Sequence, residues 1–122
     1  MFNKKIALNV IVGAAAPVSG ICFLQQATAA IVSPAASVTV TQSYAYSNFG
    51  GGDFVFSTSV GASGCENGWY IKATDPGYKA VVASVLTAQA GGNFVLVYGD
   101  NSDVWPGSNG HFCRVQSVGI TS

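Results

Sequence analysis

Only one segment of this chain has apolar residues at the spacing of a helix. In its other apolar segments, apolar and polar residues tend to alternate, as in strands. Between residues 78 and 90 the apolar side chains recur at helical spacing, at Val81, Val82, Val85 and Leu86. Asp75 is a favoured N-cap residue, and Pro76 suits the first helical position, where its missing N–H costs nothing. Gly91 and Gly92 then predict the end of the helix. The spacing therefore predicts one helix of roughly a dozen residues.

Strand-like segments flank this helix, three before it and two after it. Alternation is clearest in the first two, and glycine-rich or polar turns separate them; they span residues 37–47, 54–60, 69–74, 93–99 and 111–120. The last segment changes face near Ser117, which indicates a slip in its alternation. The order β-β-β-α-β-β is that of the OB-fold, a five-stranded barrel. We predict a mainly β, OB-fold-like barrel with one helix, and a small sandwich with one helix is the alternative.

The N-terminal segment has the pattern of a secretory signal peptide. Lys4 and Lys5 supply a positive start, residues 6–24 supply an apolar run, and Ala27–Ala29 supplies a small-residue cleavage signal. An uncleaved membrane anchor is the alternative, but glycines and a proline interrupt the run. The pattern predicts a signal peptide over residues 1–29, cleaved after Ala29, and one domain over residues 30–122. That domain would be secreted or periplasmic, with no membrane span after cleavage.

The cysteine count depends on this cleavage. Removal of the leader takes Cys22 away and leaves Cys65 and Cys113 as an even pair in an oxidising compartment. We therefore predict a disulfide between Cys65 and Cys113, which the OB-fold would permit because its third and fifth strands are neighbours. A metal or redox pair is the competing interpretation. The chain has no C-x-x-C motif and a single histidine, so we predict no metal site and no cofactor.

Charge and residue types argue against two classes of function. Residues 30–122 carry three basic side chains against five acidic ones, a net charge of −2, which makes a poor surface for neutralising phosphates. We therefore expect no nucleic-acid partner. Catalysis needs a nucleophile with a base, paired carboxylates or a metal cluster, and His111 stands alone as a candidate base. We predict that the protein is not an enzyme and that His111 is a polar residue at a strand end.

Residues 100–110 form the most informative polar segment, which we expect to be a loop between the last two strands. Trp105 follows the oxygen-rich residues Asp100, Asn101 and Asp103, and an aromatic plate beside carboxylate and amide groups suits sugar recognition. In an OB-fold the loop between the first two strands lies on the same side, which adds Asn48 and Phe49. These six residues are the predicted ligand-binding site. Two alternatives remain, a Trp105 that caps the barrel and a calcium-binding turn, although the glycine and distal glutamate of a calcium loop are missing.

Two further features concern packing. Trp69 follows the first cysteine of the pair closely and is predicted to lie in the core. The side of the helix opposite its apolar stripe carries small residues and little charge, at Ala80, Ala83, Ser84, Thr87 and Ala90. Such a face suits contact with copies of the same chain, and a mildly polar surface helix is the alternative.

Several of these segments together resemble a known family. The matching residues are Cys65, residues 68–70, the helix at 78–92, the strand at 95–98 and the segment from Cys113 to 120. Their layout resembles the receptor-binding B subunits of AB5 toxins, of the pertussis-like and subtilase-cytotoxin type, and related exported bacterial proteins. The resemblance implies an OB-fold, a homo-oligomeric ring (a pentamer) and binding of cell-surface glycans. At the level of residues it extends only to the Cys65–Cys113 bond, because residues 30–50 do not align with the family.

The combined prediction is an exported, non-enzymatic domain that binds a ligand, either a cell-surface glycan or a protein, with a glycan favoured. A second hypothesis is a structural or interaction protein of the bacterial envelope or extracellular matrix. A third is a periplasmic inhibitor that binds one protein partner.

Overall fold

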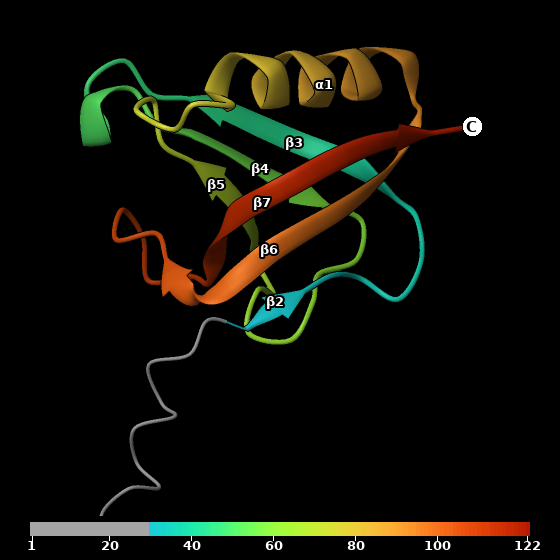
Figure 1. The fold of residues 1–122 in the computed structure, drawn as a ribbon, viewed down its shortest axis with the longest axis horizontal. Helices are drawn as coiled ribbons and strands as arrows, with labels where there is room; N and C mark the ends of the chain where they lie inside the picture. Colours follow the sequence, from blue (N-terminus) through green and yellow to red (C-terminus); the bar gives the residue numbers. More distant parts are fainter. Residues whose placement is uncertain (1–29) are drawn as a thin grey trace, which may run out of the picture.

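The structure of the protein is a computed structural model that describes residues 30–122. The predicted signal peptide and Cys22 lie outside the described residues. In chain order the elements are β2 (Ile31–Val32), β3 (Val38–Ala45), the 3₁₀ turn η3 (Phe49–Gly51), β4 (Phe54–Thr58), β5 (Gly68–Ile71), α1 (Tyr78–Gly91), β6 (Phe94–Val104) and β7 (Phe112–Thr121). The prediction of a mainly β fold with one helix is confirmed (Figure 1).

The strands form one sheet that closes on itself. Around the ring, β3 pairs with β4, β4 with β5, β5 with β7, β7 with β6, and β6 with β3. The pairing of β5 with β7 is parallel, and the other pairings in the ring are antiparallel. β2 is an additional strand that the sequence pattern did not reveal, because two residues are too few to show a period. It lies on the edge of β6 outside the ring.

The interior of the ring is filled by alternate residues of its strands. The fully buried side chains on this side include Phe56, Trp69, Val95 and Val97. Trp69 confirms the core prediction, and its indole N–H donates a hydrogen bond to Thr58 Oγ1 at 3.0 Å. Gly99 of β6 lies directly against the Trp69 ring, where an added Cβ would come within 2.7 Å of Cζ3. Glycine is therefore required at position 99 for the tryptophan to fit.

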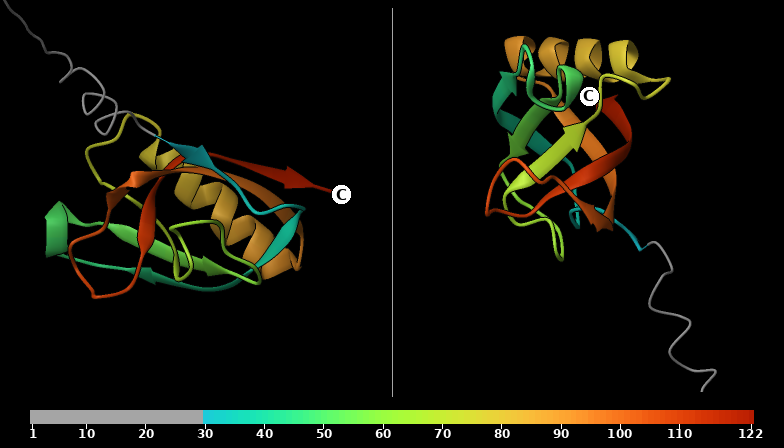
Figure 2. Two further views of the ribbon diagram at one scale, coloured as in Figure 1. Left: turned by 90° about the horizontal axis from the view of Figure 1, so that it is seen from below. Right: turned by 90° about the vertical axis from the view of Figure 1, so that its left-hand side faces the viewer.

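Helix α1 lies across one end of the ring, as the views in Figure 2 show. Its predicted end is confirmed, because Gly92 caps the last turn with a left-handed backbone at φ 66°. Its predicted start is wrong. The helix begins at Tyr78 with Gly77 at the N-cap, and the Asp75 carboxylate makes no cap hydrogen bond because it is engaged by Lys72 N–H and by Arg114.

The buried face of α1 is narrower than the apolar stripe predicts. Val85 and Ala88 are buried, and Val81 and Val82 are partly buried against the same core. Leu86, which the spacing placed in the stripe, has 47% of its surface exposed. Small side chains approach the sheet most closely, so Ala88 occupies the inner position and Leu86 is turned outward.

The predicted disulfide between Cys65 and Cys113 is present. Cys65 precedes β5, Cys113 belongs to β7, and both side chains are fully buried. The two strands run in parallel with Trp69 opposite Cys113, so the bond joins segments that are already neighbours in the sheet. The predicted slip near Ser117 also appears, as a register shift between Tyr98 and Gly99 opposite Ser117 and Val115.

Candidate functional site

Trp105, the centre of the predicted binding site, is buried. Only 4% of its surface is exposed, and its indole N–H donates a hydrogen bond to Asp53 Oδ2 at 3.0 Å. Its ring centroid lies 5.3 Å from that of Phe49 and 5.3 Å from that of Tyr46. The two predicted loops therefore do meet, as expected, but they meet by covering Trp105. The ring offers no open face for a sugar in this conformation.

The burial of Trp105 follows from the outer face of the sheet. Val55 of β4 and Tyr70 of β5 point away from the ring interior, yet both are buried because Trp105 packs on them. Phe112, which is itself partly buried, packs against the same cluster. The structure is thus closer to the alternative interpretation, in which Trp105 is a buried cap. It covers the outer face of β4 and β5.

Phe49 and Asn48 remain accessible beside this cluster. Phe49 has 46% of its surface exposed, and Asn48 is exposed in the turn that leads into η3. Neither side chain lies among the residues that line the pocket described below. Any ligand contact at Asn48 or Phe49 would be on an open surface.

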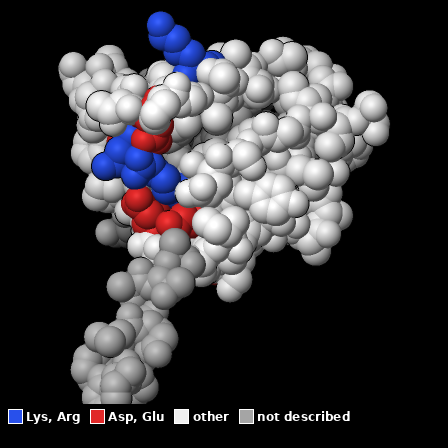
Figure 3. Space-filling model, viewed as in Figure 1, with Lys and Arg blue, Asp and Glu red and all other residues white. Residues whose placement is uncertain are grey.

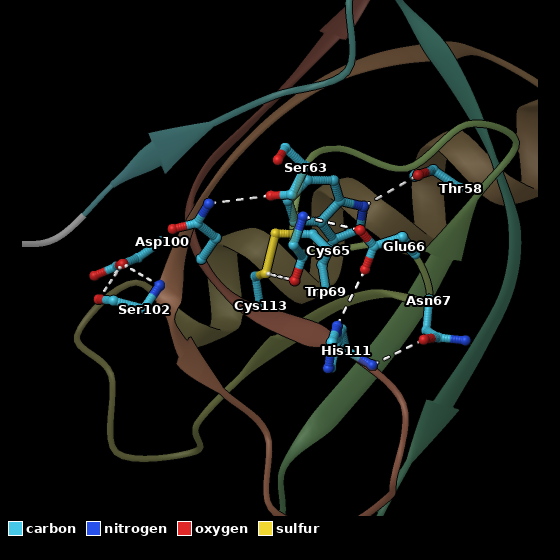
Figure 4. Close-up of a disulfide and its surroundings, with 12 residues drawn as sticks. Thr58, Ser63, Cys65, Glu66, Asn67, Trp69, Asp100, Ser102, His111 and Cys113 are labelled. Atoms are coloured by element: carbon cyan, nitrogen blue, oxygen red, sulfur yellow. Dashed lines mark hydrogen bonds and ion pairs between the residues drawn. A yellow bond between two sulfur atoms is a disulfide. The ribbon is translucent and has the colours of Figure 1, made fainter.

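Asp100, Asn101 and Asp103 do not form a loop, because β6 continues to Val104. The predicted loop begins only at Trp105. Asn101 supports the fold, since its amide donates a hydrogen bond to the carbonyl oxygen of Ser63 at 3.1 Å. Asp100 accepts hydrogen bonds at Oδ1 from the backbone N–H and the hydroxyl of Ser102, at 2.9 and 2.6 Å (Figure 4).

A pocket of about 440 Å³ lies where α1 and the corner before it meet the sheet, and Asp100 and Asp103 belong to it. Its walls come from β5, β6, β7, α1 and that corner; they are Ile71, Asp75, Pro76, Gly77, Val81, Asp100, Asp103, Arg114, Val115 and Gln116. The volume falls within the range of about 300–1,000 Å³ typical of small-molecule sites. Figure 3 shows basic atoms between acidic atoms at one side of a face that is otherwise largely uncharged.

Arg114 organises the polar wall of this pocket. Its Nε–H and an Nη2–H donate hydrogen bonds to the two oxygens of Asp75, the first at 3.0 Å, and an Nη1–H donates to Asp103 Oδ2 at 2.9 Å. The second oxygen of Asp103 accepts a hydrogen bond from the Tyr70 hydroxyl at 2.5 Å. Tyr70 thereby connects the buried Trp105 cluster to the pocket. Three of the five guanidinium N–H groups are used in this network, which leaves two.

Sequence reasoning missed Arg114, Asp75 and Tyr70 as site residues. Arg114 stood between two residues of the core pattern, and Asp75 was assigned to the helix cap. One signal was available in the sequence: Arg114 is a single arginine between two apolar residues of a strand. A partly buried cation in such a position needs a carboxylate partner.

Hydrogen bonds and burial shift the pKa values of four side chains at the site. Hydrogen bonds donated by Arg114 hold the pKa of Asp75 below its usual value, and the same bonds to Asp75 raise the pKa of Arg114. Burial, together with the hydrogen bond to Asp103, raises the pKa of Tyr70. Hydrogen bonds from Ser102 lower the pKa of Asp100. The pocket wall combines the guanidinium of Arg114 with the side chains of Asp75, Asp100 and Asp103.

We expect Asp75 to contribute stability that acid removes. Because its folded pKa lies below its unfolded value of 3.8, the contribution is complete above that value and is lost as the pH falls through the folded pKa. Asp75→Asn should lower the free energy of unfolding by about 1.5–3 kcal/mol at pH 7, the range for hydrogen bonds to charged groups. Urea unfolding from pH 7 to pH 2 should show a smaller acid-induced loss in this variant than in the wild type. Lys79→Gln, which changes an exposed side chain of α1 and leaves every carboxylate in place, is the control. Equal pH profiles for Asp75→Asn and wild type would contradict the assignment.

The remaining candidates show no further site chemistry. His111 is exposed, and its Nδ1 lies 3.1 Å from Glu66 Oε1 (Figure 4). Within residues 30–122 no group of three or more histidine, cysteine, aspartate or glutamate side chains is arranged to hold a metal ion. Over the same residues no helix has both the length and the apolar character needed to cross a membrane.

The small-residue face of α1 is accessible, as its pattern suggested. Ala80, Ala83, Thr87 and Ala90 are exposed, and Leu86 lies exposed among them. Contact between copies of the chain through this face stays a prediction.

Comparison with known proteins gives no match to a family model, to a curated protein or to a solved structure. The resemblance to AB5 toxin B subunits therefore stays a prediction.

Proposed function

We propose that the chain is an exported, non-enzymatic binding domain with an OB-like barrel, and that it binds a glycan in the pocket around Arg114. The closed ring of strands and the parallel contact between the third and fifth strands of that ring support the OB-like assignment. The predicted signal peptide and the Cys65–Cys113 disulfide support export. Export would place the domain in the periplasm or outside the cell.

The observation that carries glycan binding is the arrangement of Arg114 between Asp75 and Asp103 in a pocket of suitable size. A sugar hydroxyl both donates and accepts hydrogen bonds, so a wall with fixed N–H donors beside carboxylate acceptors suits it. The network is formed before any ligand arrives, which lowers the entropic cost of binding. The apolar side chains of Ile71, Val81 and Val115 add a surface for the C–H groups of a sugar ring.

The charge balance of the pocket selects among glycans. Three carboxylates face one guanidinium, and Arg114 is already paired on two sides. An acidic sugar would meet net negative charge, whereas a neutral sugar would not. We therefore propose neutral glycans as the ligand class.

The test is a glycan array, followed by calorimetric titration with the best neutral glycan. Asp100→Asn keeps the shape of the pocket wall and removes one charged acceptor, so it should weaken binding about 10- to 100-fold. Glu66→Gln lies outside the pocket and should bind like the wild type. If no neutral glycan binds, or if Asp100→Asn binds unchanged, glycan recognition at this pocket is wrong.

A specific observation also favours the interaction-protein hypothesis. Three large apolar side chains of β6 and β7 have about half of their surface exposed: Phe94 (51%), Tyr98 (44%) and Ile120 (44%). Exposed apolar residues of this kind suit contact with another protein surface, including copies of the chain. Size-exclusion chromatography with light scattering separates the hypotheses. A small closed ring favours the toxin-like domain, open-ended assembly favours the structural protein, and a monomer favours the inhibitor.

A further inference from the structure

The first described residue of the chain, Ala30, is held next to a wall of the pocket. Ile31 of β2 pairs with Asp100 of β6, and Val32 pairs with Gly99. The backbone N–H of Asn101 donates a hydrogen bond to the carbonyl oxygen of Ala30 at 3.0 Å. These ladder contacts place the backbone of Ala30 beside the segment that carries Asp100.

The pKa of Asp100 agrees with this placement of the Ala30 backbone. Hydrogen bonds from Ser102 are the main cause of the lowered pKa of Asp100, and a hydrogen bond from the backbone of Ala30 lowers it further. Asp100 in turn lines the pocket. Because Ile31 pairs with Asp100 and Ala30 accepts the hydrogen bond from Asn101, the nitrogen of Ala30 lies one residue along the β2–β6 ladder from Asp100, a residue of the proposed binding site.

The same nitrogen is the one that the predicted processing step would release. The cleavage signal Ala27–Ala29 predicts hydrolysis of the peptide bond between Ala29 and Ala30. Water breaks that C–N bond, and at neutral pH the products are a carboxylate on Ala29 and a protonated α-amino group on Ala30. A neutral amide N–H thus becomes an ammonium group with three N–H donors.

We propose that processing after Ala29 creates an α-ammonium group on Ala30 that pairs with the Asp100 carboxylate and completes the polar wall of the pocket. This inference rests on the export part of the proposed function and not on glycan binding. The charged groups nearest to the new charge along the sheet are Asp100, which pairs with Ile31, and Arg114, which lies opposite Asp100 in β7. Asp103 is paired with Arg114, and Glu66 in the neighbouring loop lies beside His111. The ammonium group would supply N–H donors next to the Asp100 carboxylate, whereas the hydrogen bonds of Arg114 go to Asp75 and Asp103.

The pairing has a consequence for pH dependence. A carboxylate beside an amine raises the pKa of the amine, so the ion pair stabilises the folded state below the ordinary α-amino range and is lost as the pH rises through the folded value. We expect the Ala30 amine to titrate above the ordinary range of about 7.7–8.0. In Asp100→Asn it should return to that range, and in Glu66→Gln it should stay raised.

The experiment uses the full chain, expressed with its leader in an exporting bacterium. N-terminal sequencing and intact mass identify the first residue of the product, and an NMR titration follows its α-amine in the wild type and both variants. Nα-acetylated protein is a second control, and its thermal midpoint should fall below that of the free amine at pH 6 and match it above pH 10.

A product that begins at another residue overturns the proposal, as does an amine that titrates in the ordinary range in both wild type and Asp100→Asn. Failure of every glycan to bind would instead overturn the proposed ligand and leave the amine titration as it is. The two failures are therefore distinguishable.

Discussion

Replacement of both Cys65 and Cys113 by alanine is expected to lower the free energy of unfolding by about 4 kcal/mol. The bond joins residues separated by 48 positions, and in the chain-entropy model a loop of that length constrains the unfolded chain by about this amount. Small domains have total stabilities of about 5–15 kcal/mol, so the loss is a large fraction. The variant should unfold at a much lower denaturant concentration and should be partly unfolded at elevated temperature.

Guanidinium unfolding followed by tryptophan fluorescence measures this change. The alanine pair avoids a free thiol that could form bonds between chains. Cys22→Ala is a matched control, because it lies in the predicted leader and should leave the exported product unchanged. Equal unfolding midpoints for the double variant and the wild type would show that the bond contributes little to the folded state.

Trp105→Ala is expected to cost about 3–5 kcal/mol, the usual range for removal of a buried aromatic side chain. Its ring covers Val55 and Tyr70 on the outer face of the sheet, so the substitution opens a cavity there. It also removes the hydrogen-bond donor to Asp53 Oδ2. Asp53 is 2% exposed, and its Oδ1 has no hydrogen-bond partner among residues 30–122, so the loss leaves a buried carboxylate without the indole donor.

Trp105→Phe separates the two parts of this effect, since it keeps most of the ring and removes the N–H. It should cost less than the alanine variant, and the difference measures packing. Both variants are measured by urea unfolding without ligand. If Trp105→Ala unfolds like the wild type but no longer binds a glycan, the original interpretation of Trp105 as a binding platform would be correct and the structural role assigned to it would be wrong.

The strands and the end of the helix were predictable because their signals are local. Alternation in residues 37–47 and 54–60 indicates extended strands, and Gly92 provides the left-handed backbone that ends α1. The start of α1 was not predictable in the same way. Asp75 has the side chain of an N-cap, but Arg114, 39 positions away, engages its carboxylate more strongly than free backbone N–H groups would.

The candidate site was predicted in composition but not in arrangement. Asp100, Asp103 and Trp105 lie within six residues of one another in the sequence, which suggested one loop. In the structure β6 runs to Val104, so Asp100 and Asp103 line the pocket while Trp105 turns onto the outer face of β4 and β5. Asp100 pairs with Arg114 and Val104 with Cys113 of β7, and the register shifts between them, so β6 continues past its polar residues although they have little strand propensity of their own.

What the amino-acid sequence determined by itself was the presence of the five strands of the ring, the single helix and its end, the cysteine pair and the low net charge. Each depends on residue type and on spacing along the chain. The tertiary structure alone decided that Arg114 meets Asp75 and Asp103, that Trp105 is covered, and that Ala30 lies beside Asp100. The reason is that these contacts join segments far apart in the sequence, and their positions follow from the β5–β7, β6–β7 and β2–β6 pairings rather than from any local pattern.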